Sequence, residues 1–314
     1  NNMRFKNIIV ISLIFLIMGC DGSYESNDDE MVTELNRNAL KFMAVGDSGT
    51  VLTSSDGKSW TIRDSGTSQS LYSITIRDND VSYLAVGNLG KVLTSSDGIA
   101  WISKSSGTTQ NLREVTYSNS NFVAVGGYGT IITSTDGNNW HSKSPIVGIT
   151  YEGISFGTSN FVVVGESGEI LTSSTGNSWT SQSSGISGNL KGVTFGNSIF
   201  VVVGATGTIL TSTDGTSWTS RNSGISRMLE SVIYAENTFV AVGDEGTIIT
   251  SIDGILWTSR TSSTSANLKE VTYGNNMFVT VGASGTILTS SDGIDWTEIT
   301  SGSTFTLNGV TAIR

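Results

Sequence analysis

Few side chains in this sequence have the types and spacing that catalysis needs. The chain contains one histidine, His141, and one cysteine, Cys20. His141 directly follows Trp140, at a position that is threonine in most copies of a repeated motif, and we expect an exposed outer strand there. A Ser–His–Asp or Cys–His site needs the histidine beside a nucleophile in a pocket. The sequence therefore argues against nucleophilic catalysis of this kind.

Paired carboxylates are the remaining catalytic candidates. Glycoside hydrolysis uses two carboxyl groups that flank the bond to be cleaved. Glu152 with Glu230, or Asp244 with Glu245, could form such a pair. Other motifs of that chemistry are missing, so we predict a protein that is not an enzyme and uses no cofactor. A glycoside hydrolase stays open as the alternative.

The spacing of the tryptophans indicates which architecture must position these residues. The chain has seven tryptophans, and from the second onward they are 39 residues apart, whereas the first interval is 41. A fixed period in this range is typical of repeat architectures. The seven are Trp60, Trp101, Trp140, Trp179, Trp218, Trp257 and Trp296.

Each repeat contains four short apolar or β-prone runs separated by turn residues. In the third repeat they are Leu112–Tyr117, Phe122–Gly126, Thr130–Ser134 and a run that begins at Trp140. Such runs, joined by Gly, Asn, Ser and Asp turns, predict consecutive antiparallel hairpins. The second run is apolar throughout, so both of its faces must be covered, whereas the fourth becomes polar after its tryptophan. This gradient predicts an all-β, seven-bladed β-propeller of four-stranded antiparallel blades.

The two ends of the repeat region predict how the ring closes. A good copy of the first run is missing before Phe42, and a surplus copy, Leu307–Arg314, follows the last repeat. An open solenoid contains whole repeats and polar caps, whereas a closed ring needs its first and last blades joined. We predict that residues 307–314 form the innermost strand of the blade built from residues 41–65. Val32–Leu35 is a rival for that place.

One turn motif recurs between the third and fourth strands. Its first copy is Ser54-Ser-Asp56-Gly57-Lys-Ser-Trp60, which resembles the Asp-box, or bacterial neuraminidase repeat. In that box one residue separates Asp from Gly, whereas here the two are adjacent. The carboxylate can accept backbone N–H groups of its own hairpin, and glycine can take a positive φ. Thr175 replaces the aspartate in the fourth repeat, where we expect a weaker turn. The aspartates are Asp56, Asp97, Asp136, Asp214, Asp253 and Asp292.

The resemblance implies a propeller but not a single activity. Sialidases, xyloglucanases and non-catalytic photosystem assembly propellers share the Asp-box. A sialidase would also need a cluster of arginines, but arginines are few here, and Arg221 and Arg260 fall at the same outer-strand position. Calcium needs six to eight oxygen ligands, whereas each box offers one carboxylate, so we expect no metal.

Positions that differ between the repeats are the candidates for ligand contact. The second residue of the first strand alternates in charge over five consecutive repeats. One hypothesis is a ring of charges that coordinates a polar ligand at the central opening. The alternative is that neighbouring blades are tied by ion pairs of small individual value. These residues are Tyr72, Arg113, Glu152, Lys191, Glu230, Lys269 and Asn308.

The turn between the second and third strands also varies, and it shares a face with the loops that lead into the first strands. Exposed apolar side chains on that face would form an adhesive patch for a protein partner. A glycan that stacks on aromatic rings such as Tyr72 is the alternative partner, and unselected variation on a solvated face is the third interpretation. The other residues of this possible ligand face are Leu89, Tyr128, Met228, Asp244, Glu245 and Phe305.

The first 20 residues have the layout of a secretory signal peptide. A short basic stretch precedes the apolar run Ile8–Met18, which is too short to span a bilayer as a mature helix. Ile17-Met18-Gly19-Cys20 resembles a bacterial lipobox, which implies that Cys20 is diacylated and becomes the first residue of the mature protein. A buried N-terminal helix with an incidental cysteine is the alternative.

The chain is thus expected to have three segments. Residues 1–20 form a lipoprotein signal peptide, residues 21–38 an acidic flexible tether, and residues 39–314 the propeller. The formal charge is −10, and removal of Arg4 and Lys6 leaves −12. Such an acidic protein lacks the positive surface that nucleic acids need, and it is repelled by anionic headgroups. We predict a monomer anchored by lipid in the bacterial cell envelope, periplasmic or surface-exposed, that binds a protein or acts as an assembly scaffold.

Overall fold

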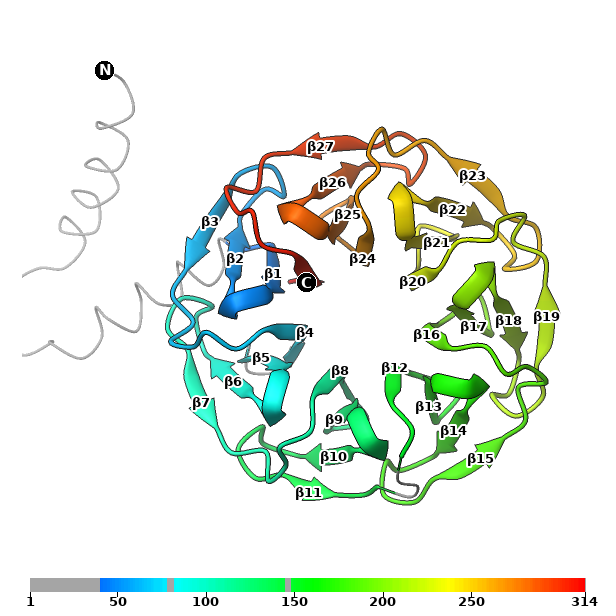
Figure 1. Ribbon diagram of the computed structural model, residues 1–314, viewed down its shortest axis with the longest axis horizontal. Coiled ribbons are helices and arrows are strands. Elements are labelled where there is room, and N and C mark those ends of the chain that lie inside the picture. The colour runs from blue at the N-terminus through cyan, green and yellow to red at the C-terminus, as the bar shows by residue number, and fades with distance from the viewer. Residues whose placement is uncertain (1–39, 78–81, 145–147, 314) are drawn as a thin grey trace, which may run out of the picture. The chain divides into compact units, whose positions relative to one another are not determined.

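Seven sheets of four antiparallel strands surround a common axis (Figure 1). The computed structural model describes residues 40–77, 82–144 and 148–313. The predicted signal peptide, Cys20, the acidic tether and the rival segment Val32–Leu35 lie outside these residues. In the described part of the chain the prediction of a seven-bladed propeller with four-stranded antiparallel blades is confirmed. No helix in this part is long and apolar enough to cross a membrane.

The strands occupy four successive places from the axis outward. The innermost strands are β4 (Leu71–Arg77), β8 (Leu112–Ser118), β12 (Tyr151–Gly157), β16 (Leu190–Gly196), β20 (Leu229–Ala235), β24 (Leu268–Gly274) and β28 (Leu307–Ala312). The second strands are β1 (Phe42–Gly46), β5 (Ser82–Gly87), β9 (Asn121–Gly126), β13 (Asn160–Gly165), β17 (Ile199–Gly204), β21 (Thr238–Gly243) and β25 (Met277–Gly282). The third strands are β2 (Val51–Ser54), β6 (Val92–Ser95), β10 (Ile131–Ser134), β14 (Ile170–Ser173), β18 (Ile209–Ser212), β22 (Ile248–Ser251) and β26 (Ile287–Ser290). The outer strands are β3 (Trp60–Arg63), β7 (Ile102–Lys104), β11 (His141–Ser142), β15 (Thr180–Gln182), β19 (Thr219–Arg221), β23 (Thr258–Arg260) and β27 (Thr297–Ile299).

A three-residue 3₁₀ turn joins the second and third strands of every blade. In each turn the middle residue has left-handed φ and ψ angles, for example φ 56° at Tyr128. A glycine with positive φ follows it, so the chain reverses tightly. The turns are η1 (Asp47–Gly49), η2 (Asn88–Gly90), η3 (Gly127–Gly129), η4 (Glu166–Gly168), η5 (Ala205–Gly207), η6 (Asp244–Gly246) and η7 (Ala283–Gly285).

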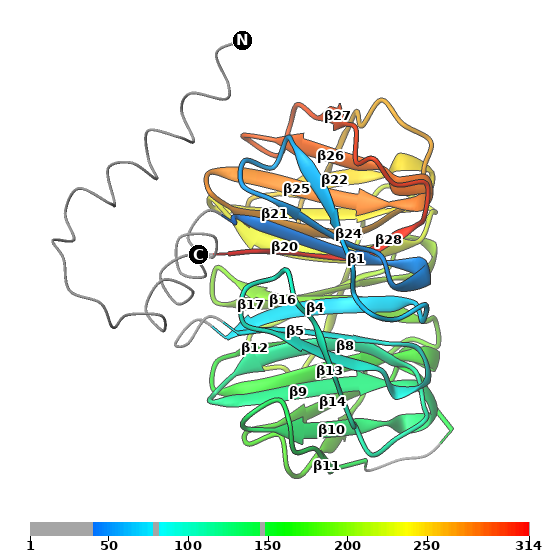
Figure 2. The same cartoon turned by 90° about the vertical axis from the view of Figure 1, so that its left-hand side faces the viewer.

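The C-terminal strand closes the ring. β28 pairs antiparallel with β1, with Phe42 opposite Ala312 and Val45 opposite Gly309. The sheet of blade one therefore has the order β28-β1-β2-β3, and two ends of the described chain lie in one blade. Figure 2 shows β1 and β28 running together between the two faces of the ring. This pairing confirms the predicted closure.

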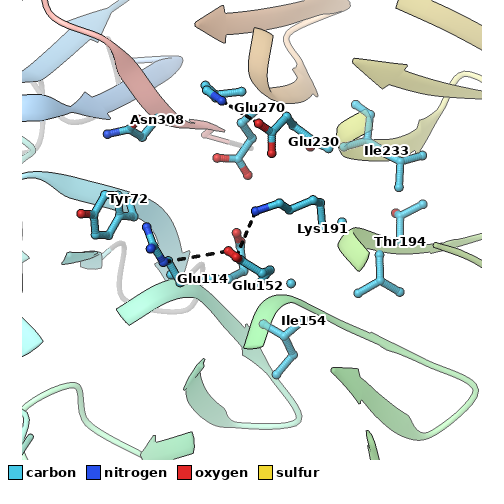
Figure 3. A pocket seen from close by; sticks show the side chains of 17 residues that line it. Tyr72, Glu114, Glu152, Ile154, Lys191, Thr194, Glu230, Ile233, Glu270 and Asn308 are labelled. Carbon is cyan, nitrogen blue, oxygen red and sulfur yellow. Dashed lines mark hydrogen bonds and ion pairs between the residues drawn. The ribbon is translucent and has the colours of Figure 1, made fainter. Parts of the chain in front are cut away.

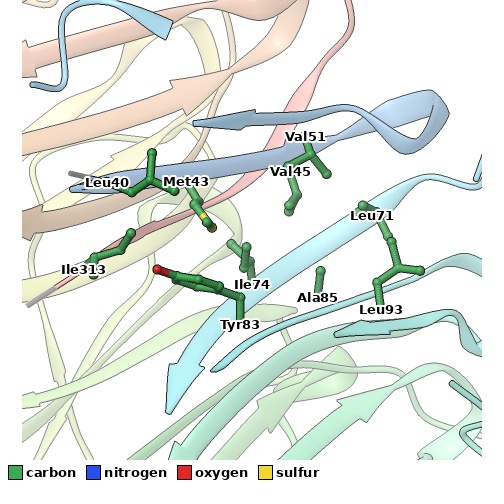
Figure 4. Close-up of a cluster of buried hydrophobic side chains, with 10 residues drawn as sticks. All are labelled: Leu40, Met43, Val45, Val51, Leu71, Ile74, Tyr83, Ala85, Leu93 and Ile313. Atoms are coloured by element: carbon green, nitrogen blue, oxygen red, sulfur yellow. The ribbon is translucent and has the colours of Figure 1, made fainter. Parts of the chain in front are cut away.

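The hydrophobic core is divided into seven clusters, one in each interface between neighbouring blades. Figure 4 shows the cluster between blades one and two, where Met43 and Val45 of β1 pack in one cluster with Tyr83 and Ala85 of β5. The alternate residues of β1, Phe42 and Ala44, pack instead against blade seven. Both faces of the second strand are thus buried, which is why its sequence is apolar at every position.

A β-bulge at the start of the innermost strand aims side chains at the axis. In blade two Leu71 lies opposite Gly87 and Ser73 opposite Val86, so Tyr72 is left without a partner residue. The same shift recurs in the other innermost strands, for example between Leu268 and Glu270. Bulges re-aim the side chains next to them. The second and third residues of these strands consequently line the axial opening.

Candidate functional site

The propeller has two faces that differ in their loops. We call the face that carries η1–η7 and the loops leading into the innermost strands the turn face. Backbone hydrogen bonds join the two kinds of loop there, for example from Asn88 N to Ser70 O at 2.8 Å. We call the opposite face, which carries the Asp-box turns, the box face.

The alternating charges of the second residues form ion pairs between neighbouring blades. Lys191 Nζ lies 3.0 Å from Glu152 Oε1, and Arg113 Nε lies 3.9 Å from Glu152 Oε2. Lys269 Nζ lies 2.6 Å from Glu230 Oε1. The guanidinium of Arg113 also stacks over the ring of Tyr72, 4.7 Å from its centroid. The structural interpretation of the alternating pattern is therefore realised in these contacts.

These residues surround an axial cavity of about 340 Å³ (Figure 3). Its position on the axis is close to the turn face, because Asn308 Nδ2 donates to Asp47 Oδ1 of η1 and to Leu71 O, each at 3.0 Å. The lining also includes the apolar residues Ile154, Val193 and Val232, which pack mainly between neighbouring blades. The cavity thus has a charged rim and a partly apolar interior.

Two carboxyl groups in this cavity were not singled out from the sequence. Glu114 and Glu270 are the third residues of β8 and β24, and they reach into the cavity from opposite sides (Figure 3). In the other blades this third position holds only serine or glycine. Two glutamates among small residues next to a predicted opening are the signal that could have identified them.

Both carboxyl groups are strongly desolvated. Both side chains line the cavity and are half-buried. Burial raises the pKa of Glu114 to about 8, against a weaker opposing hydrogen bond from Ser73. The pKa of Glu270 is raised well above its usual value, first by burial and then by the negative charge of Glu114. A hydrogen bond from Val310 N to Glu270 Oε2 at 3.0 Å works in the opposite direction.

The carboxylate pairs predicted for glycoside cleavage do not have the required environment. Glu152 and Glu230 are each engaged by a lysine of the next blade, as described above. Glu245 lies on η6 and binds Arg227 Nε at 2.6 Å, on the exposed surface. Hydrolysis needs one protonated carboxyl and one ionised carboxylate on either side of a bound sugar. The other two glutamates of the axial cavity, Glu114 and Glu270, do not meet this need either, because desolvation favours the protonated form of both.

Three exposed apolar side chains lie on consecutive blades of the turn face. Phe305 precedes β28 of blade one, Leu89 lies in η2 of blade two, and Tyr128 lies in η3 of blade three, with 49%, 59% and 62% of their surface exposed. Met228, which we expected in the same patch, is half-buried and precedes β20 of blade six. It therefore does not join the other three, because its blade lies elsewhere on the ring.

The Asp-box turns hold the box face together. Asp136 Oδ1 accepts the backbone N–H groups of Asn138 and Asn139, both at 2.8 Å, and the pKa of Asp136 falls below its usual range because of these bonds, that from Asn139 first. Trp140 Nε1 donates to the carbonyl of Gly137 at 3.2 Å. In blade four the side-chain oxygen of Thr175 accepts a single, longer bond, from Asn177 N at 3.3 Å. The turn of blade four, which the sequence predicts to be softer, thus has fewer and longer hydrogen bonds to this side chain than the turn of blade three.

The box face also carries an apolar feature that is confined to two blades. In the turn of blade six Ile252 and Leu256 are 74% and 76% exposed, and Ile255 lies between them in sequence. Ile294 is exposed in the turn of blade seven. His141, in contrast, is an exposed residue of outer strand β11, as predicted. The box face is therefore less uniform than its repeated motif suggests.

No protein-family model and no curated protein sequence matches the chain. Among solved structures it is similar to YCF48 from Cyanidioschyzon merolae, with 19% identity, a TM-score of 0.59, and coverage of 75% of this chain and 86% of that one. A structure of YCF48 bound to D1 peptide has 17% identity and a TM-score of 0.60, covering 83% and 84%. The WD40 β-propeller domain of Doa1 has 15% identity and a TM-score of 0.61, covering 81% and 87%. At these identities the likeness concerns the fold alone, and by that fold the chain is a seven-bladed β-propeller.

Proposed function

We propose that this chain is a non-enzymatic propeller of the bacterial cell envelope that binds a protein partner on its turn face. The observation that carries the proposal is the exposure of Phe305, Leu89 and Tyr128 on the turn face of three consecutive blades, a set that we call the patch. Large apolar side chains that are exposed together mark protein contact surfaces. A solved structure with a similar fold holds a bound peptide, which supports the same kind of role.

The backbone at two patch residues strengthens this argument. Leu89 has φ 52° and Tyr128 has φ 56°, and both are middle residues of their turns. Bulky residues rarely adopt this left-handed conformation, which suits Asn, Asp or Gly better. Four of the other turns hold Ser or Thr there, and the sixth holds Glu245. Large side chains kept in a strained conformation and in solvent are expected where they serve binding.

Attachment to the membrane is the second part of the proposal. It rests on the likeness of Ile17-Met18-Gly19-Cys20 to a lipobox, and we propose a monomer anchored through acylated Cys20, periplasmic or surface-exposed. The Cys20→Ala variant should move from the membrane to the soluble fraction on cell fractionation. Continued membrane association of this variant would contradict the lipid anchor.

Crosslinking in the intact envelope followed by mass spectrometry tests the docking surface. The wild type should capture a defined protein, and the Leu89→Ala/Tyr128→Ala variant should lose that product. Leu256→Ala removes an even more exposed apolar side chain from the box face and should retain the crosslinked product. Equal capture by all three proteins would contradict docking at the turn face.

Glycan binding and glycoside hydrolysis are the competing outcomes. A glycan array signal that is lost in Tyr128→Ala would assign the turn face to carbohydrate, because an aromatic ring can stack on a sugar. Hydrolysis of fluorogenic glycosides that is lost in Glu152→Gln would instead reveal a degenerate sialidase-like enzyme. Silence in both assays, together with a crosslinked protein that depends on the patch, supports the proposed function.

A further inference from the structure

The charges of the axial cavity do not all pair with one another. The cations on its rim are Arg113, Lys191 and Lys269, and each is engaged by Glu152 or Glu230. Glu114 and Glu270 form no ion pair with any residue that the structure describes. The cavity therefore presents two carboxyl groups to any ligand that enters it.

One oxygen of each carboxyl group, Glu114 and Glu270, accepts a hydrogen bond from the protein. Ser73 Oγ donates to Glu114 Oε1 at 3.1 Å and itself accepts the N–H of Val115. Val310 N donates to Oε2 of Glu270 at 3.0 Å. The second oxygen of each group accepts no hydrogen bond from the described residues. These anchors fix the carboxyl groups, so little ordering is needed when a ligand binds.

Stability of the fold does not explain why Glu114 and Glu270 stand at these positions. Serine and glycine fill the same third position in the other five blades and carry no desolvation cost. A buried carboxylate without a partner is destabilising, and the group then takes up a proton instead. A ligand that carries a positive charge would remove this penalty.

The shape of the cavity limits what that ligand can be. A volume of about 340 Å³ is at the small end of the range for ligand pockets. Ile154, Val193 and Val232 offer an apolar wall beside the carboxyl groups. The described residues contain no group of three or more His, Cys, Asp or Glu side chains placed to hold a metal ion. The surroundings suit an organic cation that has a short alkyl stem.

We propose that the axial cavity binds an ammonium or guanidinium group on an alkyl chain, with the charge between Glu114 and Glu270 and the alkyl stem against Ile154 and Val232. The source of this cation is a basic side chain of a peptide docked on the turn face, or a small free amine. The cavity site does not require the docking surface proposed above, because a free amine can occupy it alone.

Binding of the cation displaces protons from the two carboxyl groups. The affinity for an alkylammonium ion should rise as the pH increases through about 8, the pKa of Glu114, and should fall again near pH ~10.4, where an amine loses its own proton. An alkylguanidinium ion keeps its charge and should show only the rise. The other charged groups that face the cavity are Arg113 on β8, Glu152 on β12, Lys191 on β16, Glu230 on β20 and Lys269 on β24.

Calorimetric titration of the full chain in non-ionic detergent tests the proposal. The probes are n-butylammonium, n-butylguanidinium and, as a neutral mimic of the same shape, n-butanol. Both cations should bind to the wild type, with proton release measured from titrations in two buffers of different ionisation enthalpy, and butanol should bind at least about tenfold more weakly. Similar affinity for butanol and for butylammonium, or no binding of either cation, overturns the proposal.

A pair of matched variants locates the site. Glu114→Gln/Glu270→Gln keeps the size of both side chains and removes their charge, and it should weaken butylammonium binding by at least about tenfold. Glu298→Gln makes the same chemical change on exposed outer strand β27 and should leave binding unchanged. Undiminished binding by a folded double variant overturns the assignment, and should the variant fail to fold, absence of proton release by the wild type has the same consequence.

A further comparison separates the two sources of the cation. The capped peptide acetyl-Gly-Lys-Gly-amide is titrated beside its norleucine counterpart and beside free butylammonium. Tighter binding of the lysine peptide assigns the cavity to a docked basic side chain, and tighter binding of the free amine assigns it to a small molecule. Failure of the envelope crosslinking experiment would leave both of these results unaffected.

Discussion

Glu114 of blade three and Glu270 of blade seven extend into the same axial cavity, and the negative charge of Glu114 raises the pKa of Glu270. Desolvation is the larger cause for both groups, and it raises the pKa of Glu114 from 4.5 to about 8. The folded protein thus holds protons that the unfolded chain releases above about pH 4.5. The stability linked to these protons is fully present below pH 4.5 and is lost as the pH rises through about 8.

Replacement of both glutamates by glutamine should therefore stabilise the protein only at high pH. At pH 9 the Glu114→Gln/Glu270→Gln variant should gain about 2–4 kcal/mol in free energy of unfolding, after allowance for the water of the cavity, and at pH 4.5 it should match the wild type. Urea denaturation at both pH values measures the difference, with Glu298→Gln, a single Glu-to-Gln change on an exposed strand, as the control. A gain that is the same at both pH values would show that desolvation of the carboxyl groups is not the cause.

The Asp-box aspartates should impose the opposite dependence at low pH. Hydrogen bonds from backbone N–H groups hold the pKa of Asp136 and of Asp214 below the usual range. The largest contribution comes from the N–H of Asn139 for Asp136 and from the N–H of Ser217 for Asp214. A carboxylate whose pKa is lowered by folding contributes its full stability when the pH is above the pKa of the unfolded chain, about 3.8. This contribution is lost as the pH falls through the lower pKa of the folded protein. Thermal melting should accordingly show greatest stability near pH 4–5. A melting temperature that is constant from pH 5 to pH 2 would contradict this role of the turns.

Restoring the missing aspartate of blade four should strengthen its turn. In Thr175→Asp the carboxylate can accept the N–H groups of Asn177 and Ser178, whereas Thr175 Oγ1 now accepts only that of Asn177 at 3.3 Å. A charged acceptor is stronger than a hydroxyl, so we expect a gain of about 1 kcal/mol and a melting temperature about 2 °C higher at pH 7. Thr175→Asn has a similar shape without the charge and should gain less. No rise in either variant would mean that the turn is already optimal.

A glycine at the end of each second strand should be intolerant of a side chain. A Cβ on Gly126 would lie 1.9 Å from the carbonyl oxygen of Asn111, which also accepts the N–H of Gly127 at 2.8 Å. Gly126→Ala must displace this loop, and we expect it to cost at least about 2–3 kcal/mol. Gly188→Ala is the matched control, because no atom lies within 4 Å of its added Cβ. Equal denaturation midpoints for the two variants would refute the close approach.

Removal of the closing strand should destabilise the whole propeller. Deletion of residues 307–314 exposes β1, whose Phe42 and Ala44 belong to the cluster between blades seven and one. A graded variant, Val310→Ala, removes two methyl groups from a side chain that is 3% exposed and should cost about 2 kcal/mol. Circular dichroism during thermal melting measures both effects. A deletion variant with the wild-type melting temperature would rule out closure through β28.

Local patterns in the sequence were sufficient to predict the scaffold. The apolar run Phe42–Gly46 has to be covered on both faces, and that requirement predicts stacked sheets. The surplus run at residues 307–314 predicted the closing strand, which pairs with β1 as expected. The Asp-box turns likewise depend on atoms within a few residues of one another, so the loss of the carboxylate acceptor at Thr175 can be read from the sequence.

The cavity and the patch were decided by the ring as a whole. Glu114 and Glu270 are far apart in the chain, and only the arrangement of the blades around the axis brings them into one cavity and desolvates them. Loop type alone predicts Met228 on the same surface as Tyr128, but the order of the blades separates them. Sequence periodicity specifies which strand and which face a residue occupies. The distance between residues of different blades, and the water that reaches them, follow only from how the closed ring packs.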